Sequence, residues 1–157
     1  QLQWLTTTKK ANFSINNLPK QLIAEQFQQD KTQIKLFTLQ SLRSHDQYNT
    51  TIYGMNDRYR GISNQRNVLF INGKDANKLG FDDGESVDIT SIWHDNETRQ
   101  VKDFILCFYD IPRGNLAAYY PETNPLVPLD SIGDKSFTPT SKSVAVYLEK
   151  STKKRII

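Results

Sequence analysis

The chain has 157 residues, a length typical of about one domain. Its 20 Lys and Arg against 17 Asp and Glu give a formal charge of +3, too small for a protein that coats nucleic acid. Apolar residues make up 37% of the sequence, which excludes wholesale disorder, and no apolar run is long enough for a membrane span.

The first third of the chain predicts one helix, one strand and a long loop. We expect residues 1–30 to form a lead-in segment whose helix begins at Pro19. A strand is predicted over Gln33–Leu42, and a loop runs from Arg43 to about Gln65. Loops of this length are uncommon in compact domains and are usually functional or disordered. The tyrosines, asparagines and arginines of this loop are typical of an ordered binding loop.

The middle of the chain predicts strands separated by short turns. Val68–Ile71 has the composition of a short buried strand. Asp75 is predicted to be the N-cap of a short helix that ends at Gly80. Two longer strands, Glu85–Trp93 and Thr98–Tyr109, are expected to pair through a hairpin turn.

The last third predicts a short helix, a proline-rich loop and a final strand. The helix is expected over Asn115–Tyr120, where Pro121 stops it. The final strand rests on the alternation of Val144, Val146 and Leu148. Short strands, long loops and few helices together indicate a mainly β fold, a small barrel with helical decoration. We expect the barrel to span 31–149 and a basic tail to follow over 150–157.

The residue types that carry catalysis are scarce. His45 and His94 are the only histidines, and their surroundings fit neither a metal site nor a Ser–His–Asp triad. The single cysteine excludes an internal disulfide or a thiolate zinc site. Cys107 lies in an apolar run and is expected to be a small buried hydrophobe in a strand. The sequence therefore favours binding over catalysis and predicts no catalytic or metal-ligating residue.

The long loop is suited to a nucleotide-like ligand. Arg43 can pair bidentately with a phosphate. The serine, glutamine and asparagine side chains that follow supply neutral donors and acceptors for a guanine or pterin edge. The alternative is that Arg43 is a solvated loop charge and that the tyrosines only pack.

Four motifs occur in an order that resembles a known family. They are Ser41–Asn49, the segment Asn72–Ala76 with Gly80 and Asp83–Val87, Ala118–Leu126 and Thr138–Val146. In this order they resemble the C-terminal molybdopterin-dinucleotide-binding domain of the dimethyl sulfoxide reductase superfamily. Each motif alone is weak, and the ordered set is specific.

Two further stretches refine the resemblance. Lys9–Phe13 is similar to an element that precedes this domain in the family, with Lys9 in the place of a glycine. The insertion Asn49–Ile62 resembles the formate-dehydrogenase-alpha-like oxidoreductases. The resemblance implies a double-psi β-barrel-like domain with a few short helices. It also implies a cytoplasmic fragment of an oxidoreductase.

The resemblance implies a bis-molybdopterin guanine dinucleotide cofactor that carries molybdenum. The molybdenum ligand and any 4Fe-4S cluster belong to upstream domains of the parent enzyme, which are the implied partner. No catalytic residue is therefore expected in this chain. The side chains that the resemblance assigns to the cofactor are Arg43, Ser44, Gln47, Asn49, Asn72, Asp75, Tyr120, Asn124, Ser141 and Lys142.

Two other classes of function stay open at this point. One is a protein-interaction barrel, that is, an adaptor domain. The other is a basic nucleic-acid-binding module, suggested by Lys150, Lys153, Lys154 and Arg155. Because charges at a terminus usually form a solvated tail, we expect no nucleic-acid partner.

Overall fold

The computed structural model describes residues 3–15, 17–28, 34–45, 47 and 54–152. Six strands close into a barrel with the neighbour order β1-β5-β2-β4-β3-β6. The strands are β1 (Phe37–Leu42), β2 (Val68–Ile71), β3 (Ser86–Ser91), β4 (Arg99–Phe108), β5 (Asn115–Tyr119) and β6 (Val144–Lys150). The helical elements are α1 (Ile23–Gln28), α2 (Gly73–Leu79) and the 3₁₀ turn η1 (Asn124–Leu126). The predicted mainly β barrel with a few short helices is confirmed.

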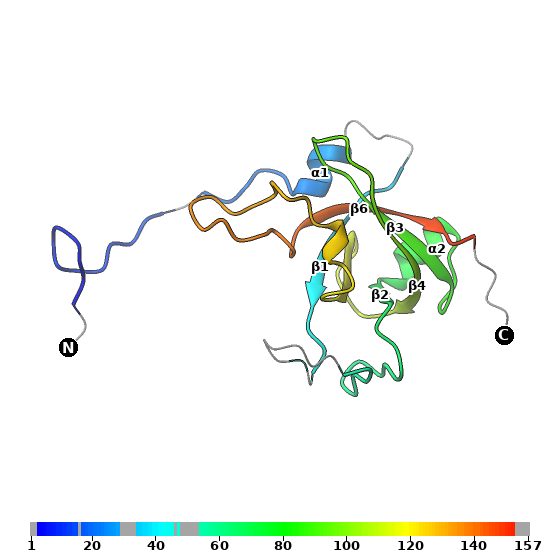
Figure 1. Cartoon of the computed structure of the whole chain (residues 1–157). Coiled ribbons are helices and arrows are strands. Elements are labelled where there is room, and N and C mark those ends of the chain that lie inside the picture. Colours follow the sequence, from blue (N-terminus) through cyan, green and yellow to red (C-terminus); the bar gives the residue numbers. More distant parts are fainter. Residues whose placement is uncertain (1–2, 16, 29–33, 46, 48–53, 153–157) are drawn as a thin grey trace.

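Two parallel strand pairs are built into an otherwise antiparallel barrel. β1 pairs in parallel with β5, and β2 in parallel with β4. β5 runs antiparallel to β2, and β1 runs antiparallel to β6. The last residues of β1 and β5 therefore meet the first residues of β2 and β6 at one end of the barrel (Figure 1). This arrangement fits the double-psi barrel expected from the sequence.

We name the two ends of the barrel after a buried charged residue at each. The Arg66 end contains the last residues of β1 and β5 and the loop that leads into β2, below the barrel in Figure 1. The Asp75 end contains the first residues of β1 and β5, together with α2. Arg66 and Asp75 are 6% and 5% exposed.

The barrel interior is filled by alternate residues of the strands. Phe37 and Leu39 of β1 pack there with Leu69 and Ile71 of β2. The other face of β2 is covered as well, because Val68 and Phe70 pack with Ile62 and with side chains of β5. A strand buried on both faces has an uninterrupted apolar sequence, which explains the run over Val68–Ile71.

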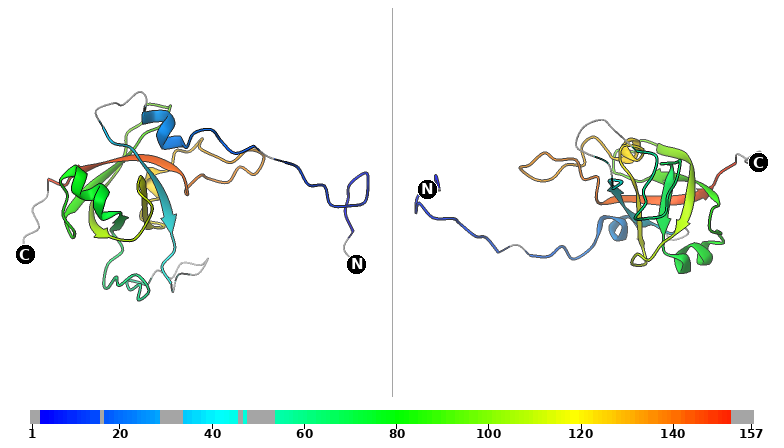
Figure 2. Two further views of the ribbon diagram at one scale, coloured as in Figure 1. Left: turned by 180° about the vertical axis from the view of Figure 1, so that it is seen from behind. Right: turned by 90° about the horizontal axis from the view of Figure 1, so that it is seen from below.

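The lead-in helix begins four residues later than predicted. α1 starts at Ile23 because the Glu25 carboxylate accepts a hydrogen bond from the Leu22 backbone N–H (2.8 Å), which caps the first turn. Pro19 lies before the helix. Ala24 and Phe27 are buried against Leu36 and Ala145, so α1 packs on the barrel. The segment before it extends away from the barrel (Figures 1 and 2) and exposes Phe13, Ile15 and Leu18 among other apolar side chains.

The predicted capping of the second helix is half right. Gly80 ends α2 in the left-handed conformation (φ 74°), as expected for a glycine at this position. The N-cap, however, is Asn72, whose side chain accepts from Lys74 N at 3.0 Å. Asp75 lies in the first turn of the helix, and its carboxylate accepts hydrogen bonds from the Arg113–Gly114 turn instead.

The predicted helix over Asn115–Tyr120 is wrong. Residues 115–119 form β5, which lies between β1 and β2 in the barrel wall. Leu116 and Ala118 face the barrel interior, and Ala117 and Tyr119 pack on its outer side. The leucine and alanines favour a helix locally, and the hydrogen bonds to two neighbouring strands override that preference.

The other predicted strands are present with somewhat different bounds, and Cys107 is less buried than predicted. Lys150, predicted to begin the basic tail, ends β6 and pairs with Glu85 at 2.9 Å. Residues 153–157 of that tail lie outside the described residues. Cys107 lies in β4 and is half-buried, and burial together with the Asp83 charge raises the pKa of its thiol. Among the described helices, none is long and apolar enough to cross a membrane.

Candidate functional site

A buried arginine organises the Arg66 end of the barrel. The Arg66 Nε donates to Glu122 Oε1 at 2.6 Å, and Nη2 donates to the Tyr120 carbonyl at 2.7 Å. The Nη1 group donates to Ser44 Oγ and to the Gly54 carbonyl, both at 3.0 Å. One guanidinium therefore joins the end of β1, the long loop and the residues that follow β5. Its carbon also lies 5.0 Å from the centre of the Tyr119 ring.

Ser44 and Gln47 are held in place around this arginine. The Gln47 Oε1 accepts from Ser44 N and from Arg66 Nη2, both at 3.2 Å. Its Nε2 donates to the Tyr120 carbonyl at 2.9 Å. Both side chains are buried. The turn after β1 is consequently fixed to the chain after β5, although the two segments are more than 70 residues apart.

A second buried charge, Asp57, joins the long loop to β5. Asp57 is 1% exposed, and its carboxylate accepts from Arg60 Nη1 at 2.5 Å and from the Tyr119 hydroxyl at 2.9 Å. Burial alone would raise the pKa of Asp57, and the hydrogen bonds from Arg60 and Tyr119 outweigh it and lower the pKa below its ordinary value. Burial and the nearby Asp57 charge raise the pKa of Tyr119. The loop is thus tied to β5 by an ionised carboxylate.

Arg43 and Lys142 bring two positive charges to the surface of this end. They follow β1 and precede β6, which are adjacent antiparallel strands. Burial and the Arg43 charge lower the pKa of Lys142, which donates to the Ser41 carbonyl. Among the described residues, no carboxylate forms an ion pair with either cation. Two neighbouring cations that repel each other are a favourable place for a dianion.

The structure brings most of the predicted cofactor residues together at the Arg66 end. This group comprises Arg43, Ser44, Gln47, Tyr120, Asn124, Ser141 and Lys142. The Ser41 N–H donates to the Ser141 carbonyl at 2.9 Å, and the Tyr120 N–H donates to the Leu42 carbonyl at 2.8 Å. Asn124 is exposed at the start of η1. Asn49 lies outside the described residues.

The other two predicted residues lie at the Asp75 end. Asn72 caps α2 and donates to the Ile111 carbonyl at 2.8 Å. Asp75 accepts from Arg113 Nε at 2.8 Å and from the Gly114 N–H at 2.6 Å. Their polar atoms fix the turn before β5. Whether they contact a cofactor stays a prediction, and the structure separates them from the group at the Arg66 end.

Arg66 and Glu122 are the residues that the sequence analysis missed as organisers of the site. Arg66 stands two residues before a strand whose four residues are all buried. A charged residue next to such a strand indicates a buried ion pair, because burial of an unpaired charge is costly. That signal was present in the sequence, but nothing in it identifies Glu122 as the partner.

The chemistry of the Arg66 end fits a nucleoside diphosphate group. Arg43 and Lys142 are cations of the kind that pair with phosphate oxygens, whereas the buried Ser44 and Gln47 side chains already bond to Arg66 and to the Tyr120 carbonyl. Tyr59 and Tyr120 are 65% and 37% exposed at the same end and offer aromatic faces for a heterocycle. These groups are binding groups, and the fit to the predicted cofactor is therefore with its dinucleotide part.

The chain shares sequence with known proteins. A family model described as "Molydopterin dinucleotide binding domain" matches residues 37–146. The chain is 48% identical over 157 residues to an uncharacterized oxidoreductase of Mycobacterium tuberculosis, covering 94% of this chain and 18% of that protein. It is 36% identical over 151 residues to the protein YdeP of Escherichia coli, covering 95% of this chain and 19% of YdeP. The chain therefore spans about a fifth of the length of these relatives.

Proposed function

The chain belongs to the molydopterin dinucleotide binding domain family, and from this membership we propose that it binds the guanine dinucleotide form of the cofactor at the Arg66 end. The single observation that carries the proposal is the pair Arg43 and Lys142. Arg43 follows β1, and Lys142, whose Nζ donates to the Ser41 carbonyl, precedes the neighbouring strand β6, so both lie at the end of the barrel where the loops are fixed by Arg66. The family match spans both of them.

The proposed contacts follow from the arrangement. Arg43 and Lys142 bind the pyrophosphate, and Tyr120, Asn124 and Ser141 contact the nucleotide beside it. Ser44 and Gln47, which the resemblance also assigned to the cofactor, present the Arg43 turn in the correct orientation. We leave Asn72 and Asp75 out of these contacts because their polar atoms already hold the opposite end.

We further propose that the chain is part of an oxidoreductase whose cofactor is bis-molybdopterin guanine dinucleotide with molybdenum. A relative named as an oxidoreductase supports this, and the chain covers only 18% of that relative. When bound, the cofactor supplies the redox chemistry, and this chain binds and orients it. The reaction would belong to the whole parent protein, with upstream domains as partner. Formate-dehydrogenase-like specificity and a cytoplasmic location stay predictions of the motif resemblance.

The experiment is a proton–nitrogen NMR titration of the chain with guanosine diphosphate. The expected result is a set of shifts at residues 43, 44, 47, 120, 124, 141 and 142, with a Kd of about millimolar because a site between domains is only partly present. Guanosine without phosphates should cause much smaller shifts. Shifts mainly at 150–152, reproduced by any polyanion, would reject the assigned site.

One arginine variant and one lysine variant distinguish binding at the proposed site from nonspecific attraction to positive charge. Arg43→Ala should weaken guanosine diphosphate binding about fivefold, the upper value for one exposed ion pair. Lys102→Ala removes an exposed positive charge from β4 and should leave the affinity unchanged. Equal affinities for the two variants would show that Arg43 has no specific role.

A further inference from the structure

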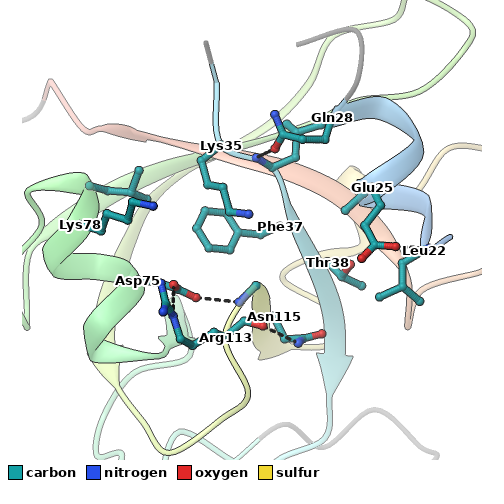
Figure 3. Close-up of a pocket in the computed structure, with 14 residues that line it drawn as sticks. Leu22, Glu25, Gln28, Lys35, Phe37, Thr38, Asp75, Lys78, Arg113 and Asn115 are labelled. Carbon is teal, nitrogen blue, oxygen red and sulfur yellow. Dashed lines mark hydrogen bonds and ion pairs between the residues drawn. The ribbon is translucent and has the colours of Figure 1, made fainter. Parts of the chain in front are cut away.

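A pocket opens at the Asp75 end, on the opposite side of the barrel from the proposed cofactor site. It has a volume of about 660 Å³, which lies in the range of small-molecule sites. Its walls come from α1, the start of β1, α2 and the turn before β5 (Figure 3). Four segments that are distant in sequence therefore enclose one concave space.

The rim of the pocket is cationic. Lys35 and Lys78 reach it from β1's lead-in and from α2, and Figure 3 shows their amines on either side of the Phe37 ring. Neither lysine forms an ion pair with another described residue. Arg113 adds a third cation. Within the described residues, its contact with Asp75 uses only Nε, so its two Nη groups can donate to a ligand.

The negative charges at the pocket are already engaged. Asp75 is buried and accepts from Arg113 and from the Gly114 N–H, and these hydrogen bonds lower its pKa against the opposing effect of burial. The Glu25 carboxylate accepts from the Leu22 N–H at 2.8 Å and so caps α1. The charge of Lys35 also contributes to the lowered pKa of Asp75, so an anion that enters the pocket would share Lys35 with this carboxylate. Lys78 forms no ion pair with another described residue.

The remaining wall is apolar. Leu22, next to α1, and Leu79 of α2 are 49% and 36% exposed, and they give the pocket an apolar surface that a ligand can reach. A bare inorganic anion would leave this surface in contact with water. A ligand with a carbon body would cover it and gain the corresponding hydrophobic free energy.

We propose that this pocket is a second binding site, which takes a small organic anion with an apolar or aromatic body and one carboxylate or phosphate group. The anionic group pairs with Lys35 and Lys78, and the body lies against Leu22 and Leu79. The concave shape favours a small molecule over a flat protein partner. The site does not depend on the proposed function of the Arg66 end.

The test titrates the 157-residue chain with four small-molecule probes and monitors binding by proton–nitrogen NMR. Phenyl phosphate and benzoate carry both a ring and a charge, inorganic phosphate has no ring, and benzyl alcohol has no charge. We expect the first two to shift the amides of Lys35, Thr38, Lys78 and Gly114, and the tighter of them identifies the preferred anionic group. Inorganic phosphate and benzyl alcohol should bind at least threefold more weakly.

A matched pair of variants on α2 tests the role of charge. Lys78→Gln should weaken the better probe three- to fivefold, as expected for one exposed ion pair. Lys74→Gln makes the same change on the same helix, outside the pocket, and should have no effect. Equal effects of the two variants, or equal affinities for phenyl phosphate and inorganic phosphate, would overturn the proposal. So would shifts centred on residues 43 and 142.

Discussion

Each end of the barrel contains a buried charged residue, and the two residues have different structural roles. At one end Arg66 gathers the turn after β1, the long loop and the chain after β5. At the other end Asp75 joins α2 to the single turn before β5. The hydrogen bonds of Arg66 hold together three segments that no strand pairing joins, and those of Asp75 fix one turn. The buried charge that joins several loops lies at the end where we propose that the dinucleotide binds, and the other buried charge fixes a single turn.

The largest effect should come from breaking the Arg66 end. Arg66→Met removes the partner of Glu122 and leaves the Tyr120 carbonyl with the Gln47 amide as its remaining described donor. We expect the free energy of unfolding to fall by about 3–5 kcal/mol, the usual cost of breaking a buried ion pair. Urea denaturation measures it. Arg58→Met, at an exposed arginine of the same loop, should cost less than about 0.5 kcal/mol. A comparable loss in both variants would remove the distinction.

Breaking the Asp75 end should have a smaller and purely structural effect. Asp75→Asn weakens the hydrogen bonds from Arg113 and the Gly114 N–H, at a cost of about 2 kcal/mol. Asp134→Asn, on an exposed loop, is the matched control and should be neutral. Guanosine diphosphate binding by Asp75→Asn should equal that of the unmodified chain. A loss of binding without a loss of folding would reassign Asp75 to the ligand.

Acid should weaken both ends through the same mechanism. Hydrogen bonds lower the pKa of Asp57 at one end and of Asp75 at the other, in both cases against burial. A depressed folded-state pKa contributes stability that is fully present above the ordinary value of 3.8 and is lost as pH falls through the folded-state pKa. Urea denaturation between pH 6 and pH 2 should show this decline. In Asp75→Asn the decline should be shallower, and an unchanged slope would contradict the assignment.

The smallest effect distinguishes the exposed cations from the buried ones. Raising the salt concentration screens Arg43 and Lys142, because the Debye length falls from about 10 Å at 0.1 M to about 3 Å at 1 M. Guanosine diphosphate binding should weaken about two- to threefold over this range. The stability that depends on Arg66 should change little, since Arg66 is buried. Binding that is insensitive to salt would argue against a contact through these cations.

The sequence predicted most of the barrel because its strands carry local patterns. The apolar run of β2 and the alternation in β6 were sufficient to place both strands. β5 was mistaken for a helix because its short apolar sequence has no strong β preference, and only its two strand neighbours decide its conformation. The sequence analysis predicted Asp75 instead of Asn72 as the N-cap of α2 because both residue types can cap a helix. The hydrogen bond from Arg113 to Asp75 engages that carboxylate elsewhere, and Asn72 is the cap.

The site was predictable only through the motif resemblance. Arg43 and Lys142 are 99 positions apart in the sequence, and no local rule brings them to adjacent strand ends. The same holds for Arg66 and Glu122, whose contact depends on the pairing of β2 with β5. Sequence motifs grouped Asn72 and Asp75 with the cofactor residues, whereas the topology places them at the opposite end.

The closure of the barrel has a consequence for how this chain joins other proteins. Each of the six strands has a strand neighbour on both sides, so the sheet offers no free edge. Partners cannot extend it by adding a strand of their own, and edge-to-edge aggregation is blocked in the same way. Any stable association must therefore use side-chain surfaces, the loops at the two ends, or the extended segment before α1. An enzyme that employs such a domain can consequently place it against neighbouring domains without exposing them to strand exchange.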